Sequence, residues 1–394
     1  MKDTVVHSFE AGRRGKPDEL DSIIANSIAA YIMSKNNMAK FDLRVHGGFS
    51  SGDNKLFVAL GGEISEVIIN GEGFVSDIKK IVIDKFNYIH QSQITEEDMI
   101  FELHFTPQSG ALADNAAKEK IGDSGTSIAV AYAGTPVFLP WERFLAVGFR
   151  DLMDEIYFSN GEIPEDIKSK SGVEKLEGLG ADGKIEFIVE YDAAKLIKIK
   201  YITIATVHDE SLGIEELQEK VGKILKAFLS KYEEEFSVSF GEVEKIIING
   251  AGAWTNGGGW PVDAGSREAK PYRDAFSSYG VVDDSFSGED PSKGSAANAL
   301  LARKAAVFVV KEGLADFARV TLTYTIGAPE GDINIFTNGT NKIDMDEIYT
   351  RVRESVDLTL ATAIEKFGLR SADYYKNIAS SSDYFQNSDF EWNK

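Results

Sequence analysis

The stretch IEFIVEYDAAKLIKIKYITIATVHDESLGIEELQEKVGKILKAFLSKY, residues 185–232, decides the fold class. Its first half contains two β-branched, alternating runs, Ile185–Tyr191 and Leu196–Thr206, which predict two strands. Its second half carries an apolar stripe at three- and four-residue spacing: Ile214, Leu217, Val221, Ile224, Leu225, Phe228 and Tyr232. This stripe predicts an amphipathic helix that turns its apolar side to the core.

The same succession of strands and helices continues on both sides of this stretch. Similar β-branched runs predict further strands at Met99–Phe105, Ala318–Ile326 and Ile333–Thr337. Helical spacing of apolar residues recurs in Leu20–Ile32, Phe74–Phe86 and Met345–Leu360. Strands followed by a helix and then by more strands favour mixed α+β units over a doubly wound parallel sheet.

An internal echo points to repeated domains. Ile68–Gly73 reads IINGEG and Ile247–Gly252 reads IINGAG, so the two hexapeptides differ at one position. We interpret both as strand-to-turn corners of one design. Five matches in six positions also arise by chance, so the repetition is a hypothesis.

Charge and composition exclude several classes of function. The 394 residues include 63 acidic and 42 basic side chains, giving a net charge of −21. Such a field repels nucleic-acid backbones and anionic membranes, so neither is expected as a partner. The chain has no cysteine, no apolar run long enough for a membrane span and no apolar signal-peptide region near Met1. We expect a cytoplasmic protein without disulfides or thiolate metal sites.

The usual catalytic and nucleotide-binding signatures are absent. No G-x-x-x-x-G-K-[ST] loop and no G-x-S-x-G elbow occur, and the five histidines show no metal-ligand spacing. What remains is a series of charged residues in glycine-rich turns, several of them in the long irregular segments 106–125, 165–183 and 250–293. Long irregular segments in a compact protein are usually functional.

Taken in order, these turns resemble the S-adenosylmethionine synthetase family. The motifs that carry the resemblance are Gly15–Glu19 (family G-H-P-D-K), Gly61–Glu63 (G-G-E), Gln108-Ser109 (Q-S-P-D-I), Gly122–Gly125 (G-D-Q-G), Asp182–Lys184 (D-A-K), Asn249–Lys293 (the glycine-rich segment ending in F-S-G-K-D-P-[ST]-K), Tyr324–Gly327 and Phe390–Asn393. Each motif is weak alone, but together they cover almost the whole chain.

The resemblance implies both an architecture and a reaction. It implies an α+β fold of three similar domains of mixed sheet and helices around a pseudo-threefold axis. We place these domains at 1–118, 119–245 and 246–394, and they can interleave. The implied reaction joins ATP and methionine to S-adenosylmethionine and cleaves the triphosphate to diphosphate and phosphate, with Mg²⁺ as cofactor. The implied assembly is a homodimer or a dimer of dimers.

The resemblance also assigns roles to particular residues. Glu63, with Gln108, would hold the methionine ammonium. Asp18 would bind Mg²⁺. The remaining implied substrate contacts are Glu10, Asp123, the adenine-stacking Trp254 and the phosphate clamp Arg267, or Arg273 in its place. The implied catalytic group is Lys16, Lys184, Lys270, Lys293 and Asp263, with Asp263 binding the nucleotide or orienting Lys270.

Several departures from the family pattern fall on the triphosphate side. The family's histidine is Lys16 here, and its next lysine is Glu19. The lysine of F-S-G-K is Glu289. The family arginine before Lys270 falls on Ala269, and the second Mg²⁺-binding aspartate falls on Ser295. The carboxylate that would bind K⁺ is replaced in the stretch Val45–Gly48, so K⁺ is doubtful as a cofactor.

Two functions therefore stay open. The first is a divergent ATP:methionine adenosyltransferase that has rebuilt its phosphate site, with Lys16 donating to the leaving oxygen and Asp283 and Asp284 as a relocated Mg²⁺ site. The second is a catalytically weakened paralogue that binds a nucleotide or S-adenosylmethionine, or serves as partner subunit of an active synthetase. A phosphohydrolase would keep the cations and lose the methionine site, which is the opposite of the observed pattern.

Overall fold

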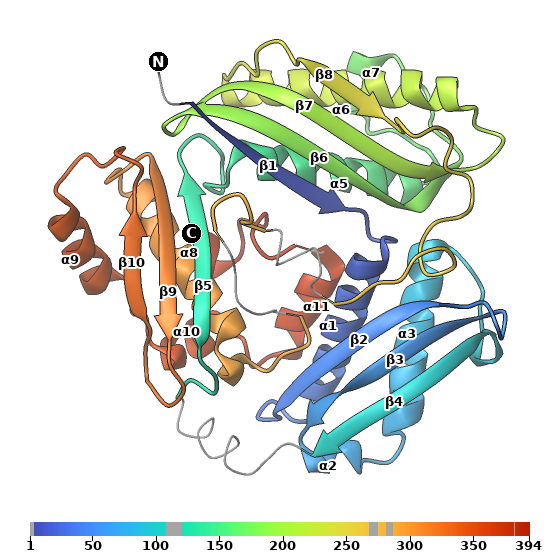
Figure 1. Ribbon diagram of the computed structural model, residues 1–394, viewed down its shortest axis with the longest axis horizontal. Coiled ribbons are helices and arrows are strands. Elements are labelled where there is room, and N and C mark those ends of the chain that lie inside the picture. Colours follow the sequence, from blue (N-terminus) through green and yellow to red (C-terminus); the bar gives the residue numbers. More distant parts are fainter. Residues whose placement is uncertain (1–3, 108–119, 268–274, 281–286, 382) are drawn as a thin grey trace.

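The computed structural model of the chain describes residues 4–107, 120–267, 275–280, 287–381 and 383–394. Within these residues, three β-sheets with helices packed against them surround a common centre (Figure 1). The predicted α+β class, built from repeated units of sheet plus helices, is confirmed. In the same residues, no helix has the length and the apolar character that crossing a bilayer requires.

The first sheet contains both the first strand of the chain and the stretch that decides the fold. Its strand order is β1 (Thr4–Gly12), β6 (Leu179–Asp192), β7 (Lys195–His208) and β8 (Lys245–Ile248). β1, β6 and β7 are antiparallel, and β8 runs parallel to β7. Its helices are α5 (Trp141–Phe158), α6 (Glu165–Ser171) and α7 (Ile214–Phe236). Because β1 pairs with β6, two of the expected domain segments interleave in this sheet, and the domain boundaries themselves stay a prediction.

The second sheet is antiparallel and lies in the C-terminal part of the chain apart from one strand. Its order is β10 (Asp332–Phe336), β9 (Phe317–Tyr324) and β5 (Gly125–Tyr132). The associated helices are α8 (Ser295–Lys311), α9 (Met345–Ser355) and α10 (Leu360–Lys366). The predicted helix over Met345–Leu360 is therefore two helices, because Val356 has extended backbone angles and ends α9.

The third sheet carries the elements closest to the candidate site. Its order is β2 (Phe41–Ser50), β3 (Lys55–Ile64) and β4 (Met99–Pro107), with β3 antiparallel to β2 and parallel to β4. It is accompanied by α1 (Pro17–Lys35), α2 (Glu66–Ile69), α3 (Phe74–His90) and α11 (Ala372–Ser381). Three 3₁₀ turns complete the described elements: η1 (Glu96–Asp98), η2 (Pro291–Lys293) and η3 (Glu391–Asn393).

The two echoing hexapeptides adopt different structures, so their interpretation as one repeated corner was wrong. Ile68 and Ile69 belong to the short helix α2, where their N–H groups donate to the carbonyl of Ser65. Ile247 instead pairs with Thr203 between β8 and β7. Tertiary pairing decides the structure of such short apolar runs, because local propensity differs little between helix and strand.

Candidate active site

In the long segment after β8, residues 263–267 run beside β2 of the third sheet, and we call them the added stretch. Gly265 N donates to Gly47 O at 3.0 Å, and Arg267 N donates to Val45 O at 3.1 Å. A Cβ on Gly265 would lie 2.3 Å from the carbonyl carbon of Pro17, so only glycine fits between β2 and the start of α1. This close passage brings residues from three distant parts of the sequence to one place.

A first group of charged side chains surrounds the start of α1. Lys16 Nζ lies 3.5 Å from Asp18 Oδ2, and both side chains are only 15% exposed. Asp18 Oδ1 accepts a hydrogen bond from Ser266 N at 3.0 Å, so the added stretch fixes the carboxylate. Asp182, at the family D-A-K position, is buried and accepts from Gly259 N at 2.7 Å. Burial raises the pKa of Asp182, against the opposing effects of Gly259 N–H and the Lys16 ammonium.

Lys184 joins this first group through β1. It is the register partner of Gly12, and a Cβ on Gly12 would lie 3.1 Å from Lys16 Cδ. Lys16 and Lys184 therefore flank the same glycine. Lys184 Nζ forms an ion pair with Glu10 Oε2 at 3.0 Å, on the adjacent strand.

A second group of charged side chains gathers around Asp42 on β2. Arg267 Nη2 donates to Asp42 Oδ1 at 2.9 Å and to Glu289 Oε1 at 3.1 Å, and Arg44 also pairs with Asp42. Lys293 Nζ donates to Asp42 Oδ2 at 3.1 Å. Burial acts to lower the pKa of Lys293, but the charge and hydrogen bond of Asp42 outweigh it and the pKa is raised. Lys293 thus stays protonated at neutral pH.

Glu289 carries a negative charge at the position where the family has a lysine, and its side chain is fully buried. Its side chain has 0% exposure, and Ser295 Oγ donates to its second oxygen at 2.7 Å. The positive charge of Arg267, 4% exposed, lies directly against it. Glu289 and Arg267 together therefore add no net charge to this group.

Two further predicted residues lie beside the second group. Glu63 is the register partner of Asp42, so both side chains lie on the same face of the sheet. Glu63 Oε2 is buried and has no hydrogen-bond partner among the described residues. Gly122 N donates to Ser292 O at 2.8 Å, which brings Asp123 close enough to Lys293 to help raise the pKa of that lysine.

The remaining predicted residues are less closely connected. Trp254 is half-buried near the end of β7, where its backbone is paired with His208, and its indole donates to Asn256 at 2.8 Å. Asp263 is exposed and accepts from Ala264 N at 2.8 Å. No hydrogen bond between described residues connects Trp254 to either charged group. The predicted residues Gln108 and Lys270, together with Ala269, Arg273, Asp283 and Asp284, lie outside the described residues.

Comparison with known proteins agrees with this arrangement. Residues 257–394 match the C-terminal domain of S-adenosylmethionine synthetase. The S-adenosylmethionine synthase of Syntrophobacter fumaroxidans is 26% identical over 395 aligned residues, covering 98% of this chain and 94% of that protein. That of Finegoldia magna is 32% identical over 224 residues, covering 56% of this chain and 55% of that protein, so that match spans about half of each.

The chain is thus similar to S-adenosylmethionine synthases along almost its whole length, and its last third matches the C-terminal domain of that family.

Relative to the motifs of the S-adenosylmethionine synthetases, the structure adds one buried residue, Asp21. Asp21, one turn after Asp18, accepts hydrogen bonds from Trp260 Nε1 at 3.0 Å and from Gly47 N at 3.1 Å. A Cβ on Gly47 would lie 1.9 Å from the Trp260 ring, so glycine is required for the indole to pack on β2. Asp21 thus anchors the loop that leads to Arg267. Desolvation raises the pKa of Asp21 to about 8.

The buried carboxyl of Asp21 predicts a specific pH dependence of stability. Its pKa is raised from 3.8 to about 8, so the folded chain retains a proton that the unfolded chain releases near pH 4. The stability contributed by this proton is present below pH 4 and is lost as the pH rises through about 8. Between pH 6 and pH 9 the free energy of unfolding should fall by about 2.5 kcal/mol more in the natural chain than in Asp21→Asn.

Urea denaturation at the two pH values measures this difference. Asp53→Asn, in an exposed turn, is the matched control and should follow the natural chain. Equal pH dependence in Asp21→Asn and the natural chain would contradict the prediction.

The carboxylates of the first charged group determine whether Mg²⁺ could bind there. Among the described residues, no group of three or more His, Asp or Glu side chains is arranged to enclose a metal ion. Mg²⁺ bound to a nucleotide needs only one or two carboxylates, because phosphates and water supply the other ligands. Asp18 is a fixed, partly exposed carboxylate beside a lysine and fits that limited role.

Proposed function

We propose that this chain is an ATP:methionine S-adenosyltransferase. The observation that supports it most strongly is the position of three lysines from distant stretches of a chain of net charge −21. Lys16 and Lys184 lie in the first group. Lys293 lies in the second group, where Asp42 is the strand partner of Glu63 with its unpartnered carboxylate oxygen. Cations suit a triphosphate, and a buried carboxylate on the same side suits the ammonium of methionine.

In the proposed reaction, the methionine sulfur attacks C5′ of ATP, and the bond from C5′ to the triphosphate oxygen breaks. The sulfur carries no proton, so no general base is needed and catalysis consists of positioning and charge stabilisation. Lys16 stabilises the negative charge that develops on the leaving oxygen. Water then cleaves the triphosphate to diphosphate and phosphate. Mg²⁺, held by Asp18, would supply further neutralisation of the phosphate charge.

The pairing of Glu289 with Arg267 favours this enzyme over a catalytically weakened paralogue. An unpaired glutamate at the family's lysine position would repel a polyphosphate. Here its charge is balanced by Arg267 at 3.1 Å, and Lys293 keeps its proton. Glu289 thus replaces the positive charge of the family lysine, but because Arg267 balances it, it adds no net negative charge to the site.

The direct test is an assay of the purified chain with ATP, methionine and Mg²⁺. We expect S-adenosylmethionine, diphosphate and phosphate in equal amounts, detected by chromatography and phosphate release. Absence of all three at high enzyme concentration would exclude the enzyme and leave the paralogue. The homodimer or dimer of dimers, the cytoplasmic location and the roles of Trp254 and Asp263 stay predictions from the family resemblance.

Glu63 provides a prediction for the methionine side. Glu63→Gln keeps the shape of the side chain but removes the charge that would pair with the methionine ammonium. The methionine KM should rise about tenfold, in line with the loss of one charge-assisted hydrogen bond, while the KM for ATP changes little. Steady-state kinetics with each substrate varied measures both. Glu102→Gln, on the exposed side of β4, is the control, and an unaltered methionine KM in Glu63→Gln would remove this residue from the site.

A further inference from the structure

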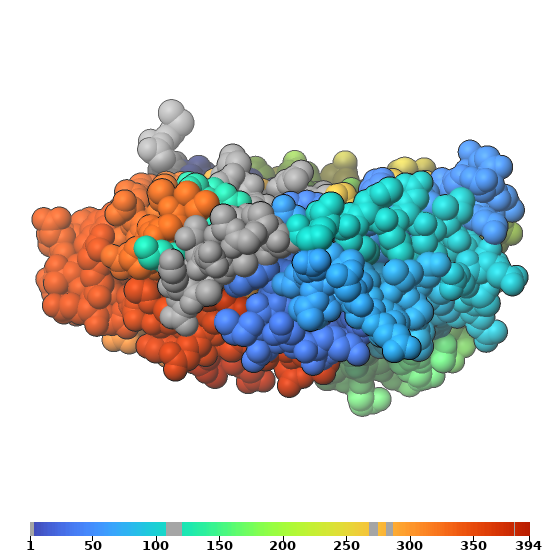
Figure 2. Space-filling view, turned by 90° about the horizontal axis from the view of Figure 1, so that it is seen from below, coloured from blue at the N-terminus to red at the C-terminus, as the bar shows by residue number. Residues whose placement is uncertain are grey.

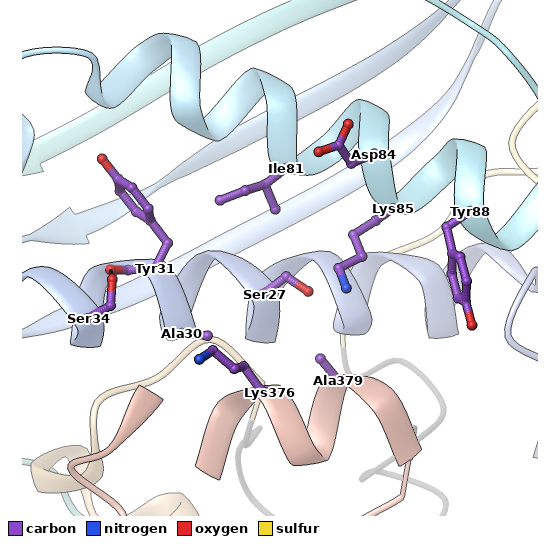
Figure 3. Close-up of a pocket in the computed structure, with 10 residues that line it drawn as sticks. All are labelled: Ser27, Ala30, Tyr31, Ser34, Ile81, Asp84, Lys85, Tyr88, Lys376 and Ala379. Atoms are coloured by element: carbon purple, nitrogen blue, oxygen red, sulfur yellow. Dashed lines mark hydrogen bonds between the residues drawn. The ribbon is translucent and has the colours of Figure 1, made fainter. Parts of the chain in front are cut away.

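A groove lies between three helices, and its lining includes no residue of the two charged groups. It has a volume of about 640 Å³ and is formed by α3 on one side, α11 on the other and α1 as its floor (Figure 3). Of the four α1 residues that line the groove, three are small, Ser27, Ala30 and Ser34, and the fourth is Tyr31. Because these three side chains are short, they do not fill the space between α3 and α11, and the groove stays open.

The chemistry of the groove comes from one ammonium and two aromatic rings. Lys85 extends from α3 toward α1, between Tyr31 and Tyr88 (Figure 3). The apolar part of the lining includes Ala30, Ile81 and Ala379. A volume of this size is typical of sites for small organic molecules.

Lys85 is a partly buried cation for which no ion pair or hydrogen bond appears among the described residues. The neighbouring carboxylate Asp84 pairs instead with Lys80 at 2.6 Å, and Lys376, across the groove, is paired with Asp373 at 3.2 Å. Burial lowers the pKa of Lys85, against the weaker opposite effect of Asp84. A cation in this position is stabilised when an anion joins it, because pairing offsets the loss of hydration.

We propose that this groove binds a small organic monoanion with a flat apolar body, an aromatic carboxylate or sulfonate, whose acidic group pairs with Lys85. One unpaired ammonium matches one negative charge, and the rings of Tyr31 and Tyr88 with the alanine floor match an aromatic body. The groove is distinct from the proposed active site, since Ser27, the floor residue near Lys85, lies about 16 Å from Lys16 along the axis of α1 (Figure 3). The proposal does not depend on the proposed function.

The test uses 8-anilinonaphthalene-1-sulfonate, an aromatic monoanion whose fluorescence rises in apolar surroundings. We expect saturable binding at one site per chain in the natural protein. Lys85→Met, which keeps the apolar stem and removes the charge, should weaken binding at least tenfold, and Lys85→Arg should stay within about threefold. Lys223→Met removes a 52% exposed lysine of α7, which does not line the groove, and should leave binding within twofold.

Two further measurements separate this site from the other candidates. Thermal unfolding of each variant shows that it is folded, and Lys85→Met should melt no lower than the natural chain because it removes an unpaired, partly buried charge. Saturating ATP and the Lys16→Ala substitution should leave dye binding unchanged. Natural affinity in folded Lys85→Met, loss of binding in Lys85→Arg, or displacement of the dye by ATP would each overturn the proposal.

Discussion

Lys16→Ala should lower kcat by about 100-fold or more and leave the methionine KM within about threefold. Removing one preorganised donor from a developing negative charge typically costs two to three orders of magnitude in rate. Lys16 is only 15% exposed and lies beside Asp18, so solvent would replace its charge poorly. In the proposed site, methionine pairs with Glu63, which lies in the other charged group and is untouched by the substitution.

The kinetics of Lys16→Ala can be separated from damage to the fold. Asp18 keeps its hydrogen bond from Ser266 N in the variant, so the start of α1 stays in place. Lys35→Ala, at the opposite end of the same helix, serves as control and should retain the natural kcat. Lys16→Arg should recover part of the rate, because it restores the charge with a different geometry. A natural kcat in Lys16→Ala would show that the leaving oxygen is stabilised elsewhere.

Arg267→Met should destabilise the chain by about 3–5 kcal/mol. The substitution leaves Glu289, 0% exposed, without the arginine that balances it, and also weakens the surroundings of Asp42. Removing one partner of a buried pair costs this much because an uncompensated charge remains out of water. Urea denaturation at pH 7 measures the difference in the free energy of unfolding.

A second substitution distinguishes pairing from packing. The double variant Arg267→Met with Glu289→Gln should recover most of the lost stability, because the uncompensated charge is gone. Arg351→Met breaks an exposed pair with Glu347 and should cost less than about 1 kcal/mol. If the double variant were as unstable as Arg267→Met alone, the arginine would act through its packing and not through its charge.

Much of the architecture could be predicted from patterns along the chain. The strands of Ile185–Tyr191 and Leu196–Thr206 and the following helix appear as β6, β7 and α7, because alternation and helical spacing are local signals. α5 was not predicted, and neither was β1. β1 is partly polar and ends in Ala11 and Gly12, and its strand character depends on pairing with β6, more than 160 residues away in the sequence.

The family resemblance supplied the members of the candidate site, whose roles stay predictions, but not their pairings. The family resemblance identified Lys16, Lys184, Glu63 and Lys293, which the structure places in two adjoining groups. Asp42 was not predicted, although it joins Arg267 to Lys293, because its role depends on the register between β2 and β3 and on the added stretch. From the sequence alone, Glu289 suggested a loss of phosphate binding. The arginine that balances its charge lies 22 residues earlier in the chain, and only the structure shows that the two side chains pair.

The first sheet has a consequence for how this protein is made. β1 emerges from the ribosome early, but its only described neighbour in the sheet, β6, is synthesised more than 160 residues later. At ordinary rates of translation this interval is about 10 to 40 seconds. During that time the nascent chain carries a strand whose backbone groups are unsatisfied, a segment that chaperones recognise and that neighbouring nascent chains can capture. Slowing translation before β6 should therefore lower the yield of folded protein.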